Sequence, residues 1–296
     1  MESEYRGLIV ESQESALGRW TVARWSPPYA SPLTGLIERI WYFEGTMTYP
    51  RERVFPDGAA ELIVMLDEPH RDGDSESLEP FPAICINGLR TRPSVVVAPP
   101  GRCRVIGVTF FPLGAALFLQ STMSDLLDVT IDVRDALGTV SQELGERCTA
   151  AAQSSAWNTG RNAAATVRAA ARWTSRRIGT ARGDALVQWA TRSIREKRGA
   201  LSLDKLGAVL GVTRAQFAQR FCEYTGLSPK RFARIVRFQH ALALLGSGED
   251  IATVAAELGY YDQPHMYRDF AEFARMSPGE FLSANRYPAS ASLAEH

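Results

Sequence analysis

The sequence has few of the residues that build disulfide frameworks and metal centres. Its 296 residues include four cysteines, with no Cys-x-x-Cys motif, and four histidines, of which only His70 lies in the first half. Scattered cysteines are typical of reduced thiols, and His-rich metal sites need several histidines close together. The inventory therefore excludes a disulfide-rich scaffold, and in the first half it excludes a His-rich metal site and a Ser-His-Asp triad. No phosphate-binding loop occurs either.

Long apolar runs and an excess of one charge are also absent. No stretch of eighteen apolar residues occurs, which predicts no transmembrane helix and no membrane partner. The first residues lack a basic segment followed by an apolar core, so we expect no signal peptide and a cytoplasmic protein. Lys and Arg number 33, as do Asp and Glu, so net charge argues neither for nor against nucleic acid, and the positions of the arginines must decide.

A repeat in the last hundred residues is the most informative pattern that is present. The segment 203–211 (LDKLGAVLG) is echoed 48 residues later by 251–259 (IATVAAELG). The echo continues, one residue out of step, in Phe221 with Phe270 and in Ser228-Pro229 with Ser277-Pro278. Each copy predicts a short helix, a glycine turn, a second helix with a polar outer face, and a third helix that begins at Ser-Pro. Two such helix-turn-helix units can contact two successive major-groove segments of DNA.

The chain ahead of this repeat changes from strand-like to helical patterns near Pro112. Runs of β-branched and aromatic residues predict strands over 36–44, 61–66, 83–86, 95–98 and 104–111. Turn dipeptides at Asp57-Gly58 and Asn87-Gly88 fit an antiparallel sandwich or barrel, with a cupin-like form as one candidate. The acidic stretch 69–82 predicts an exposed loop. Helices are expected over 114–120, 123–128, 135–152, 162–178, 184–198, 203–210, 213–224, 229–245, 251–258, 263–274 and 278–285.

These patterns predict an α+β protein. We expect a β-rich regulatory domain over 1–125, a helical connector over 126–183, an all-α domain of seven helices over 184–286, and a tail over 287–296. The segment 145–200 is basic, with eleven Arg or Lys against three acids. Within it, Val167, Ala170, Ala171 and Ile178 recur at helical spacing beside Arg161, Arg168, Arg172, Arg176 and Arg177. That pattern fits either a dimer or interdomain contact or a solvated connector, whose arginines contact DNA, acidic partners or nothing.

The second helix of the first unit, 213–224, is a candidate reading helix, meaning a helix whose outer face contacts base edges. Phe217, Phe221 and Tyr224 fall on one face and must pack inward. The outward and flanking positions are Arg214, Ala215, Ala218, Gln219 and Arg220, with Cys222 also outward. A glutamine can bond an adenine edge, an alanine methyl can touch thymine, and arginines can pair with phosphates. The alternative is a solvated helix with a polar face.

The corresponding helix of the second unit, 263–274, is the other candidate reading helix. Met266, Phe270 and Phe273 form its buried stripe, and the outward side is predicted to hold Gln263, His265, Arg268 and Glu272. Arg268 is the strongest candidate for a guanine or phosphate contact, because its planar fork suits both. His265 is expected either to donate to a phosphate or base or to be an ordinary surface histidine. We expect no metal site here.

Residues 201–286 resemble the DNA-binding domain of the AraC/XylS family of bacterial transcription regulators. The resemblance lies in the spacing of Leu203-x-x-Leu206, Gly211-Val-Thr213, Phe217-x-x-Arg220-Phe221 and Ser228-Pro229, and more closely in Gly259-Tyr-Tyr-Asp262-Gln263-x-His265-Met-x-Arg268. It implies a seven-helix fold in which helix 229–245 is a rigid spacer, and reading helices that enter the major groove about one turn apart. Members commonly carry arginine where Ala215 and Gln219 stand, so we expect the second unit to supply more of the specificity.

Residues 36–120 resemble, less specifically, a domain of unknown function found fused to such DNA-binding domains. The matching residues are Trp41-Tyr-Phe43, Pro56-Asp-Gly58, Asn87-Gly88 and the run from Gly107 to Ala115. The resemblance implies a β-rich sensor domain without indicating a ligand. Glu44, Asp57 and Glu61 fit either a polar pocket or the acids of turns and edge strands. Trp41, Tyr42 and Phe43 fit the core better than a ligand cage.

The sequence thus predicts a sequence-specific DNA-binding transcription regulator, with double-stranded DNA and RNA polymerase as partners. One alternative is a small-molecule receptor whose N-terminal ligand gates DNA binding or formation of a homodimer. The other is an enzyme whose chemistry resides in the β-rich domain, which the lack of histidines disfavours. No cofactor, catalytic residue or metal ligand is predicted.

Overall fold

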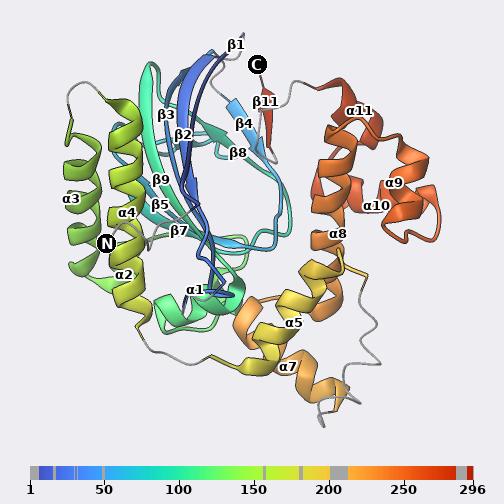
Figure 1. Cartoon of the computed structure of the whole chain (residues 1–296). Helices are drawn as coiled ribbons and strands as arrows, with labels where there is room; N and C mark the ends of the chain where they lie inside the picture. Colours follow the sequence, from blue (N-terminus) through green and yellow to red (C-terminus); the bar gives the residue numbers. More distant parts are fainter. Residues whose placement is uncertain are drawn as a thin grey trace.

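The computed structural model describes residues 7–15, 18–29, 31, 33–48, 51–155, 158–179, 183–200, 213–284 and 292–295. Figure 1 shows a β-rich part with two helices, α3 and α4, along one side and the C-terminal helices on the other side. The predicted α+β architecture is confirmed, with strands concentrated in the first part of the chain and helices in the last.

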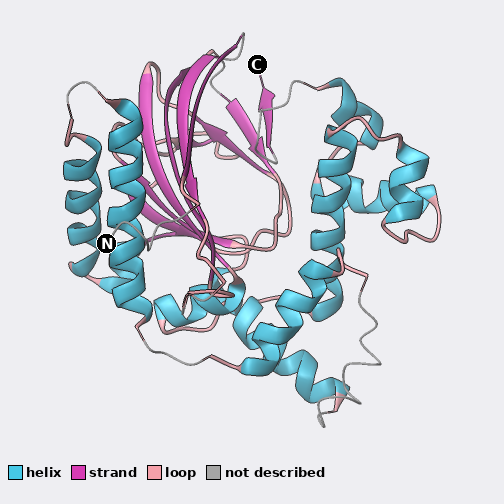
Figure 2. Cartoon of the chain, in the orientation of Figure 1, coloured by secondary structure: helices cyan, strands magenta, loops and turns pink. Residues whose placement is uncertain are grey.

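The strands described form two antiparallel sheets (Figure 2). The larger sheet has the order β1 (Ile9–Ser15), β2 (Gly18–Trp25), β3 (Ile37–Met47), β9 (Arg102–Phe110), β5 (Ala60–Met65), β7 (Ile84–Asn87) and β10 (Thr130–Asp132). The smaller sheet has the order β11 (Ser292–Glu295), β4 (Arg51–Val54), β8 (Ser94–Val97) and β6 (Arg71–Asp72). Successive side chains of a strand point to opposite faces, so the larger sheet has two distinct surfaces.

One face of the larger sheet is covered by the connector helices. Ile40 and Tyr42 of β3 are fully buried, and α4 (Thr159–Ile178) packs on β2 and β3. Val167, Ala170 and Ala171 are buried in the same core, with α3 (Val140–Ala152) packed against α4. The apolar stripe of the connector therefore contacts this chain's own sheet. That contact accounts for the spacing without a second copy of the chain.

Shorter helices link the sheet to the C-terminal part. The expected helix at 114–120 is α1 (Pro112–Leu119), and 123–128 contains only the 3-10 helix η2 (Ser124–Leu126). The single helix expected at 135–152 is instead α2 (Val133–Leu137) followed by α3. The chain breaks at Gly138, whose φ of 61° suits glycine.

The C-terminal helices follow the predicted bounds closely. They are α5 (Ala185–Glu196), α7 (Arg214–Thr225), α8 (Pro229–Gly246), α9 (Ile251–Glu257), α10 (Gln263–Phe273) and α11 (Pro278–Ser283). Asp184 caps α5, and Ser228 and Ser277 cap α8 and α11 ahead of proline, as their sequences predicted. The remaining expected helix, 203–210, lies outside the described residues. None of the helices described is long and apolar enough to span a membrane.

Several features differ from the sequence prediction. Strands β1, β2, β4 and β10 were not predicted; β1 is exposed along its whole length and has no apolar alternation. The loop expected at 69–82 contains β6, which pairs with β8. The expected tail contributes β11, which pairs antiparallel with β4, Ser292 opposite Val54 and Glu295 opposite Arg51. The β6–β8 and β11–β4 pairings join segments distant in sequence, which local patterns do not report.

Candidate DNA-reading helices and an interdomain cavity

The first candidate reading helix, α7, presents the predicted outer face. A capping box between Thr213 and Gln216 starts the helix, and Phe217 and Phe221 are buried. Of the predicted contact residues, Ala218 is half-buried and the others, Arg214, Ala215, Gln219 and Arg220, are exposed. Gln219 and Arg220 are already engaged within the chain. Gln219 Nε2 donates to Glu223 Oε1 at 3.2 Å, and Arg220 Nη1 lies 3.8 Å from Asp184 Oδ2.

The second candidate reading helix, α10, also turns its predicted residues outward. Asp262 caps it by accepting from the His265 backbone N–H at 2.8 Å, and Met266, Phe270 and Phe273 are fully buried. Gln263 is exposed, and the Arg268 side chain is 71% exposed. His265 is half-buried, with its ring perpendicular to that of Tyr260 at 5.3 Å between centroids.

The inner side of α10 carries a charge network that the sequence did not reveal. Asp269 is completely buried and accepts two hydrogen bonds from Arg234 of α8, at 2.9 and 2.7 Å. Arg234 also donates to Glu272 at 2.6 Å, and Arg231 donates to Glu272 at 3.4 Å. The prediction that Glu272 lies on the outer face is therefore wrong, because two arginines of α8 hold it at the edge of the helix interface.

The two reading helices are linked by α8. Both α7 and α10 pack against it, and its eighteen residues span roughly 27 Å at 1.5 Å per residue. Figure 1 shows α7 near one end of α8 and α10 nearer the other. The helical repeat of DNA is about 34 Å, so the length of α8 is of the order of the spacing between adjacent major-groove segments.

A large cavity of about 1280 Å³ lies between the β-rich part and the C-terminal helices. Its walls come from the face of the larger sheet opposite α4, from the smaller sheet, and from α5 and α8. Side chains from α5 include Gln188, Trp189 and Arg192, and those from α8 include Val236 and Gln239. We call it the interdomain cavity, because both parts of the chain line it.

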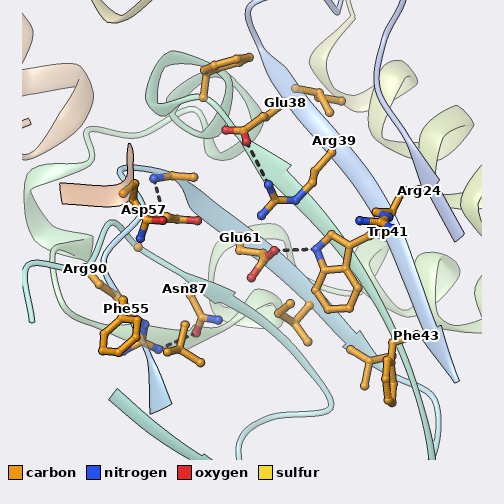
Figure 3. A pocket seen from close by; sticks show the side chains of 18 of the residues that line it. Arg24, Glu38, Arg39, Trp41, Phe43, Phe55, Asp57, Glu61, Asn87 and Arg90 are labelled. Atoms are coloured by element: carbon orange, nitrogen blue, oxygen red, sulfur yellow. Dashed lines mark hydrogen bonds and ion pairs between the residues drawn. The ribbon is translucent and has the colours of Figure 1, made fainter. Parts of the chain in front are cut away.

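One end of the interdomain cavity is polar because of strand register. Five polar residues lie side by side across five strands of the larger sheet: Arg39 opposite Thr109, Thr109 opposite Glu61, Glu61 opposite Asn87 and Asn87 opposite Thr130. Residues directly opposite each other point to the same face of a sheet. We call this set the polar row. Its Arg39, Glu61 and Asn87 line the cavity, and Figure 3 shows Glu61 between Asn87 and Trp41.

The next levels along the same strands are apolar. Trp41, Gly107, Ile63 and Cys85 lie opposite one another, followed by Phe43, Val105 and Met65. A Cβ on Gly107 would meet the Trp41 ring at 2.2 Å, so only glycine allows the indole to lie across β9. Trp41 Nε1 donates to Glu61 Oε1 at 2.7 Å, which fixes the ring beside the polar row.

The structure separates the aromatic and acidic candidates. Tyr42 is in the core, as predicted, whereas the prediction of a core position is wrong for Trp41 and Phe43, which line the cavity. Asp57 and Glu61 also line it, as the pocket interpretation requires. Glu44 does not, since it is buried on the opposite face, where it accepts hydrogen bonds from Tyr42 at 2.7 Å and from Arg102.

Several charged groups at the polar end of the cavity have shifted pKa values. Burial, with smaller contributions from the negative charges of Glu61 and Glu38, raises the pKa of Asp57 to about 6. Burial lowers the pKa of the Arg90 guanidinium. Arg90 donates to Asn87 Oδ1 and Thr130 Oγ1, both at 3.4 Å, and forms no ion pair within the described part of the chain. His70 was expected in an exposed loop but lines the cavity, where burial lowers its pKa to about 4.

The segment from Phe55 to Ala59 connects the cavity to the C-terminal helices. The Phe55 ring packs edge-on against Phe238 of α8 and Phe281 of α11, at centroid distances of 6.1 and 6.2 Å. The carbonyl of Pro56 accepts from Gln239 Nε2 at 2.6 Å. The carbonyl of Gly58 accepts from Arg195 Nη2 at 2.8 Å. The same segment carries Asp57 at the cavity wall, so its backbone and this side chain contact different parts of the molecule.

Arg195 of α5 ties this junction together. Its Nη1 lies 3.1 Å from Glu38 Oε2, and its guanidinium stacks over the Phe111 ring at 5.1 Å. Glu38 in turn accepts from Arg39 of the polar row at 3.0 Å. No cluster of three or more His, Cys, Asp or Glu side chains that could hold a metal ion occurs among the residues described.

Comparison with protein families matches two separate parts of the chain. Residues 206–284 match the family described as "Helix-turn-helix domain". Residues 27–132 match a domain of unknown function, DUF6597. The first match contains α7 to α11, and the second contains most of the two sheets.

Two curated relatives align with about a quarter of the chain. An uncharacterized HTH-type transcriptional regulator of Haemophilus influenzae is 31% identical over 80 residues, and the HTH-type transcriptional regulator MtrA of Neisseria gonorrhoeae is 32% identical over 81 residues. Each alignment covers 27% of this chain and 27% of the relative. The chain thus matches about a quarter of the length of these relatives.

Two solved structures align with parts of this chain at low sequence identity. ToxT from Vibrio cholerae O395 aligns over 79% of this chain and 95% of its own, at 11% identity and a TM-score of 0.44. The C-terminal domain of AraT, a response regulator from Geobacillus stearothermophilus, aligns over 36% of this chain and 90% of its own, at 19% identity and a TM-score of 0.33. The chain thus has a segment similar to DUF6597 followed by a segment similar to the helix-turn-helix domain family.

Proposed function

We propose that this protein is a sequence-specific DNA-binding transcription regulator in which α7 and α10 are the reading helices. The observation that carries the proposal is the placement of two capped helices with polar outer faces on one connecting helix, α8. Arg214, Ala215, Ala218, Gln219 and Arg220 are the proposed contacts on α7, and Gln263, His265 and Arg268 are those on α10. Arg268 is the foremost of these, since its side chain is the most exposed of the arginines whose ion pairs are described on these two helices.

In vitro selection of bound DNA with the full chain, at a stated salt concentration, tests this proposal. We expect a site with two short blocks about one helical turn apart, one for each reading helix. Arg268→Ala should cost about 1–3 kcal/mol at one base position if the side chain bonds a base edge. If Arg268 contacts only phosphate, the substitution should weaken binding to all DNA sequences equally. Arg176→Ala, an exposed arginine on α4, is the matched control and should leave the selected site unchanged. An Arg268 variant with wild-type affinity would contradict the assignment of α10.

We further propose that a small molecule in the interdomain cavity regulates DNA binding. Support comes from the cavity walls, because α5 and α8 close a space otherwise formed by the two sheets. A ligand there contacts both parts of the chain, so any difference in its affinity for two relative positions of those parts shifts the equilibrium between them. The Phe55–Ala59 segment supplies a physical link, since it lines the cavity and bonds α5 and α8.

Thermal stabilisation against a metabolite panel, followed by DNA titration with each stabilising compound, tests regulation. A ligand that binds the folded state raises the unfolding midpoint by mass action, and a regulator should also change DNA affinity. Gln239→Ala removes the bond to the Pro56 carbonyl and should reduce the change in DNA affinity at ligand saturation. Because Gln239 also lines the cavity, the ligand affinity of the variant is measured in the same experiment. Arg147→Ala on α3, which pairs with Glu143 of the same helix and does not line the cavity, is the control. Equal ligand effects in the Gln239 variant and the wild type would exclude this link.

A further inference from the structure

Resting on the proposed regulatory role of the interdomain cavity, we infer the chemical class of its ligand. The geometry points to an uncharged planar ring that carries an amide-like edge, with an N–H donor beside a C=O acceptor, as in a lactam. The ring would lie against Trp41 and direct this edge to Glu61 and Asn87 of the polar row. This inference rests on two neighbouring side chains: the Asn87 amide, whose oxygen is already hydrogen-bonded, and the Glu61 carboxylate beside it.

The orientation of the Asn87 amide is fixed by its neighbours. Its Oδ1 accepts from Thr130 Oγ1 at 2.7 Å and from Arg90 Nη2 at 3.4 Å. Both partners are donors, so the oxygen faces them and the Nδ2 group is the free donor of this side chain. Among the described residues Nδ2 has no hydrogen-bond partner, and Asn87 lines the cavity. An oxygen acceptor on a ligand would satisfy it.

Glu61 offers the complementary acceptor directly across from this donor. Glu61 and Asn87 are paired on β5 and β7, so their side chains leave the sheet side by side. Glu61 Oε1 accepts from Trp41 Nε1 at 2.7 Å and from Thr109 Oγ1 at 2.9 Å, which leaves Oε2 without a partner among the described residues. A free amide donor beside a free carboxylate oxygen matches the acceptor and donor of one lactam edge.

Net charge at the polar end favours an uncharged ligand. The cations Arg39 and Arg90 and the acids Asp57 and Glu61 line this end in equal number. Glu38 is paired with both Arg39 and Arg195. A ligand with a full charge would leave one charge of the cavity unbalanced in a partly dry site, which is costly, whereas a neutral amide edge adds hydrogen bonds without a counter-charge.

The apolar levels explain why the ligand should be a ring. The Trp41 indole lies across Gly107, held at its Nε1 by Glu61, so its orientation is set before a ligand arrives. An aromatic face of this kind stacks with planar groups at centroid distances of about 4.5–7 Å. Ile63 and Phe43 continue the apolar wall away from the polar row, and the volume of about 1280 Å³ leaves space for apolar substituents on the ring.

Calorimetric titration of the full chain with quinolin-2(1H)-one and with its N-methyl derivative tests the inference. The two compounds share one ring, but methylation blocks the N–H that Glu61 would accept. We expect the parent lactam to bind about tenfold more tightly, the effect of one lost hydrogen bond to a charged group. Equal affinities of the two compounds, or no binding of either at millimolar concentration, would overturn the inference. So would tighter binding of quinoline-2-carboxylate, an anion with the same ring.

Asn87→Asp tests the donor without removing the bonds that hold this side chain. An aspartate still accepts from Thr130 and Arg90, but the Nδ2 donor is lost and a second carboxylate stands opposite Glu61, so urea unfolding first checks that the fold is kept. We expect about tenfold weaker binding of the lactam. Asn158→Asp is the matched control, because Asn158 caps α4 through an oxygen that aspartate also provides. Unchanged lactam affinity in the Asn87 variant would also overturn the inference.

DNA titration of the same samples separates this inference from the proposed regulation. If the lactam binds with the expected preference but DNA affinity does not change, the ligand class stands and regulation through the cavity fails. If a compound of another class binds the cavity and changes DNA affinity, regulation stands and the ligand class is wrong.

Discussion

The two proposed reading helices share a buried apolar stripe but have different supports. Helix α10 is held within the C-terminal domain, by the buried Asp269–Arg234 pair and by edge-on packing of Phe238 against Phe270 at 5.1 Å. Helix α7 is held partly by the other half of the chain, since it packs on α1 and η2 as well as on α8. The Met123 backbone N–H donates to the Glu223 carbonyl at 3.1 Å, which joins the segment before η2 directly to α7.

This difference indicates how a change in the N-terminal domain would reach DNA. The position of α10 relative to α8 depends chiefly on contacts inside one domain. The N-terminal part adds a hydrogen bond from Arg53 Nη1 to the carbonyl of Ala274, at the end of α10, at 3.4 Å. We therefore expect α10 to respond less than α7 to a ligand in the other domain. The position of α7 depends on α1 and η2, which belong to the N-terminal side of the chain. We infer that α7 is the reading helix whose placement the N-terminal domain adjusts, and that α10 provides the constant part of DNA recognition.

Removal of Arg234, the half-buried cation that pairs with the buried Asp269 of α10, should have the largest effect. Arg234→Met leaves Asp269, which is 0% exposed, without its charged partner, and breaking a buried pair in this way costs about 3–5 kcal/mol. Urea unfolding of the full chain measures the loss. Arg231→Met is the control, because its 3.4 Å contact to Glu272 is partly exposed and should be worth at most about 1 kcal/mol. Similar costs for both variants would show that the buried pair is not what supports α10.

The next largest effect should come from replacing the glycine that ends α7, compared with a glycine between α9 and α10. Gly226 ends α7 with a φ of 71°, and a Cβ there would lie 2.9 Å from the Met123 carbonyl oxygen. Gly259, between α9 and α10, has a φ of 67° but no atom within 4 Å of the added Cβ. Alanine at either position costs about 1 kcal/mol for the left-handed backbone, and the clash at Gly226 adds about 1–3 kcal/mol. Equal losses of unfolding free energy for the two variants would mean that Met123 does not press on α7.

The pH dependence of stability probes the interface between the cavity and α8. Asp57 has a pKa of about 6 in the folded chain and an ordinary lower value when unfolded, so the folded state holds the proton more tightly. Asp57 therefore stabilises the folded state below pH 4, and this stabilisation is lost as pH rises through 6. The free energy of unfolding of the Asp57→Asn variant should exceed that of the wild type by about 1–3 kcal/mol at pH 7. Near pH 4 the two free energies should be equal. Parallel urea midpoints for the two proteins from pH 4 to 7 would refute this.

Much of the helical domain could be predicted from sequence because its signals are local. Ser228, Ser277 and Asp184 cap helices within three residues of themselves, and the buried stripes of α7 and α10 repeat with helical spacing. The placement of Asp269 and Glu272 was not predictable in this way. Their partner Arg234 lies more than thirty residues earlier, and only the crossing of α8 and α10 brings the three charges together.

The interdomain cavity was less predictable for the same physical reason. Arg39, Glu61 and Asn87 form one polar row only because the register of β3, β9, β5 and β7 sets them at one level. Trp41 has the composition of a core residue, and its place beside the cavity depends on Gly107 of a different strand. Sequence patterns indicated Asp57 and Glu61 as candidates for a pocket, but the face to which each strand residue points required the pairing of the strands.

The smallest effect should come from the contact face of α7 itself. Gln219 is exposed, but its amide already donates to Glu223 at 3.2 Å, so a base contact must replace an existing hydrogen bond. The net gain from such an exchange is small, and Gln219→Ala should cost about 1 kcal/mol or less in DNA affinity, below the cost of Arg268→Ala. Glu223→Ala sharpens the comparison, because it frees the Gln219 amide and removes a negative charge near DNA, and it should tighten binding. If Gln219→Ala instead weakens binding more than Arg268→Ala at the same salt concentration, α7 is the dominant reading helix, and the assignment of the constant part of recognition to α10 is wrong.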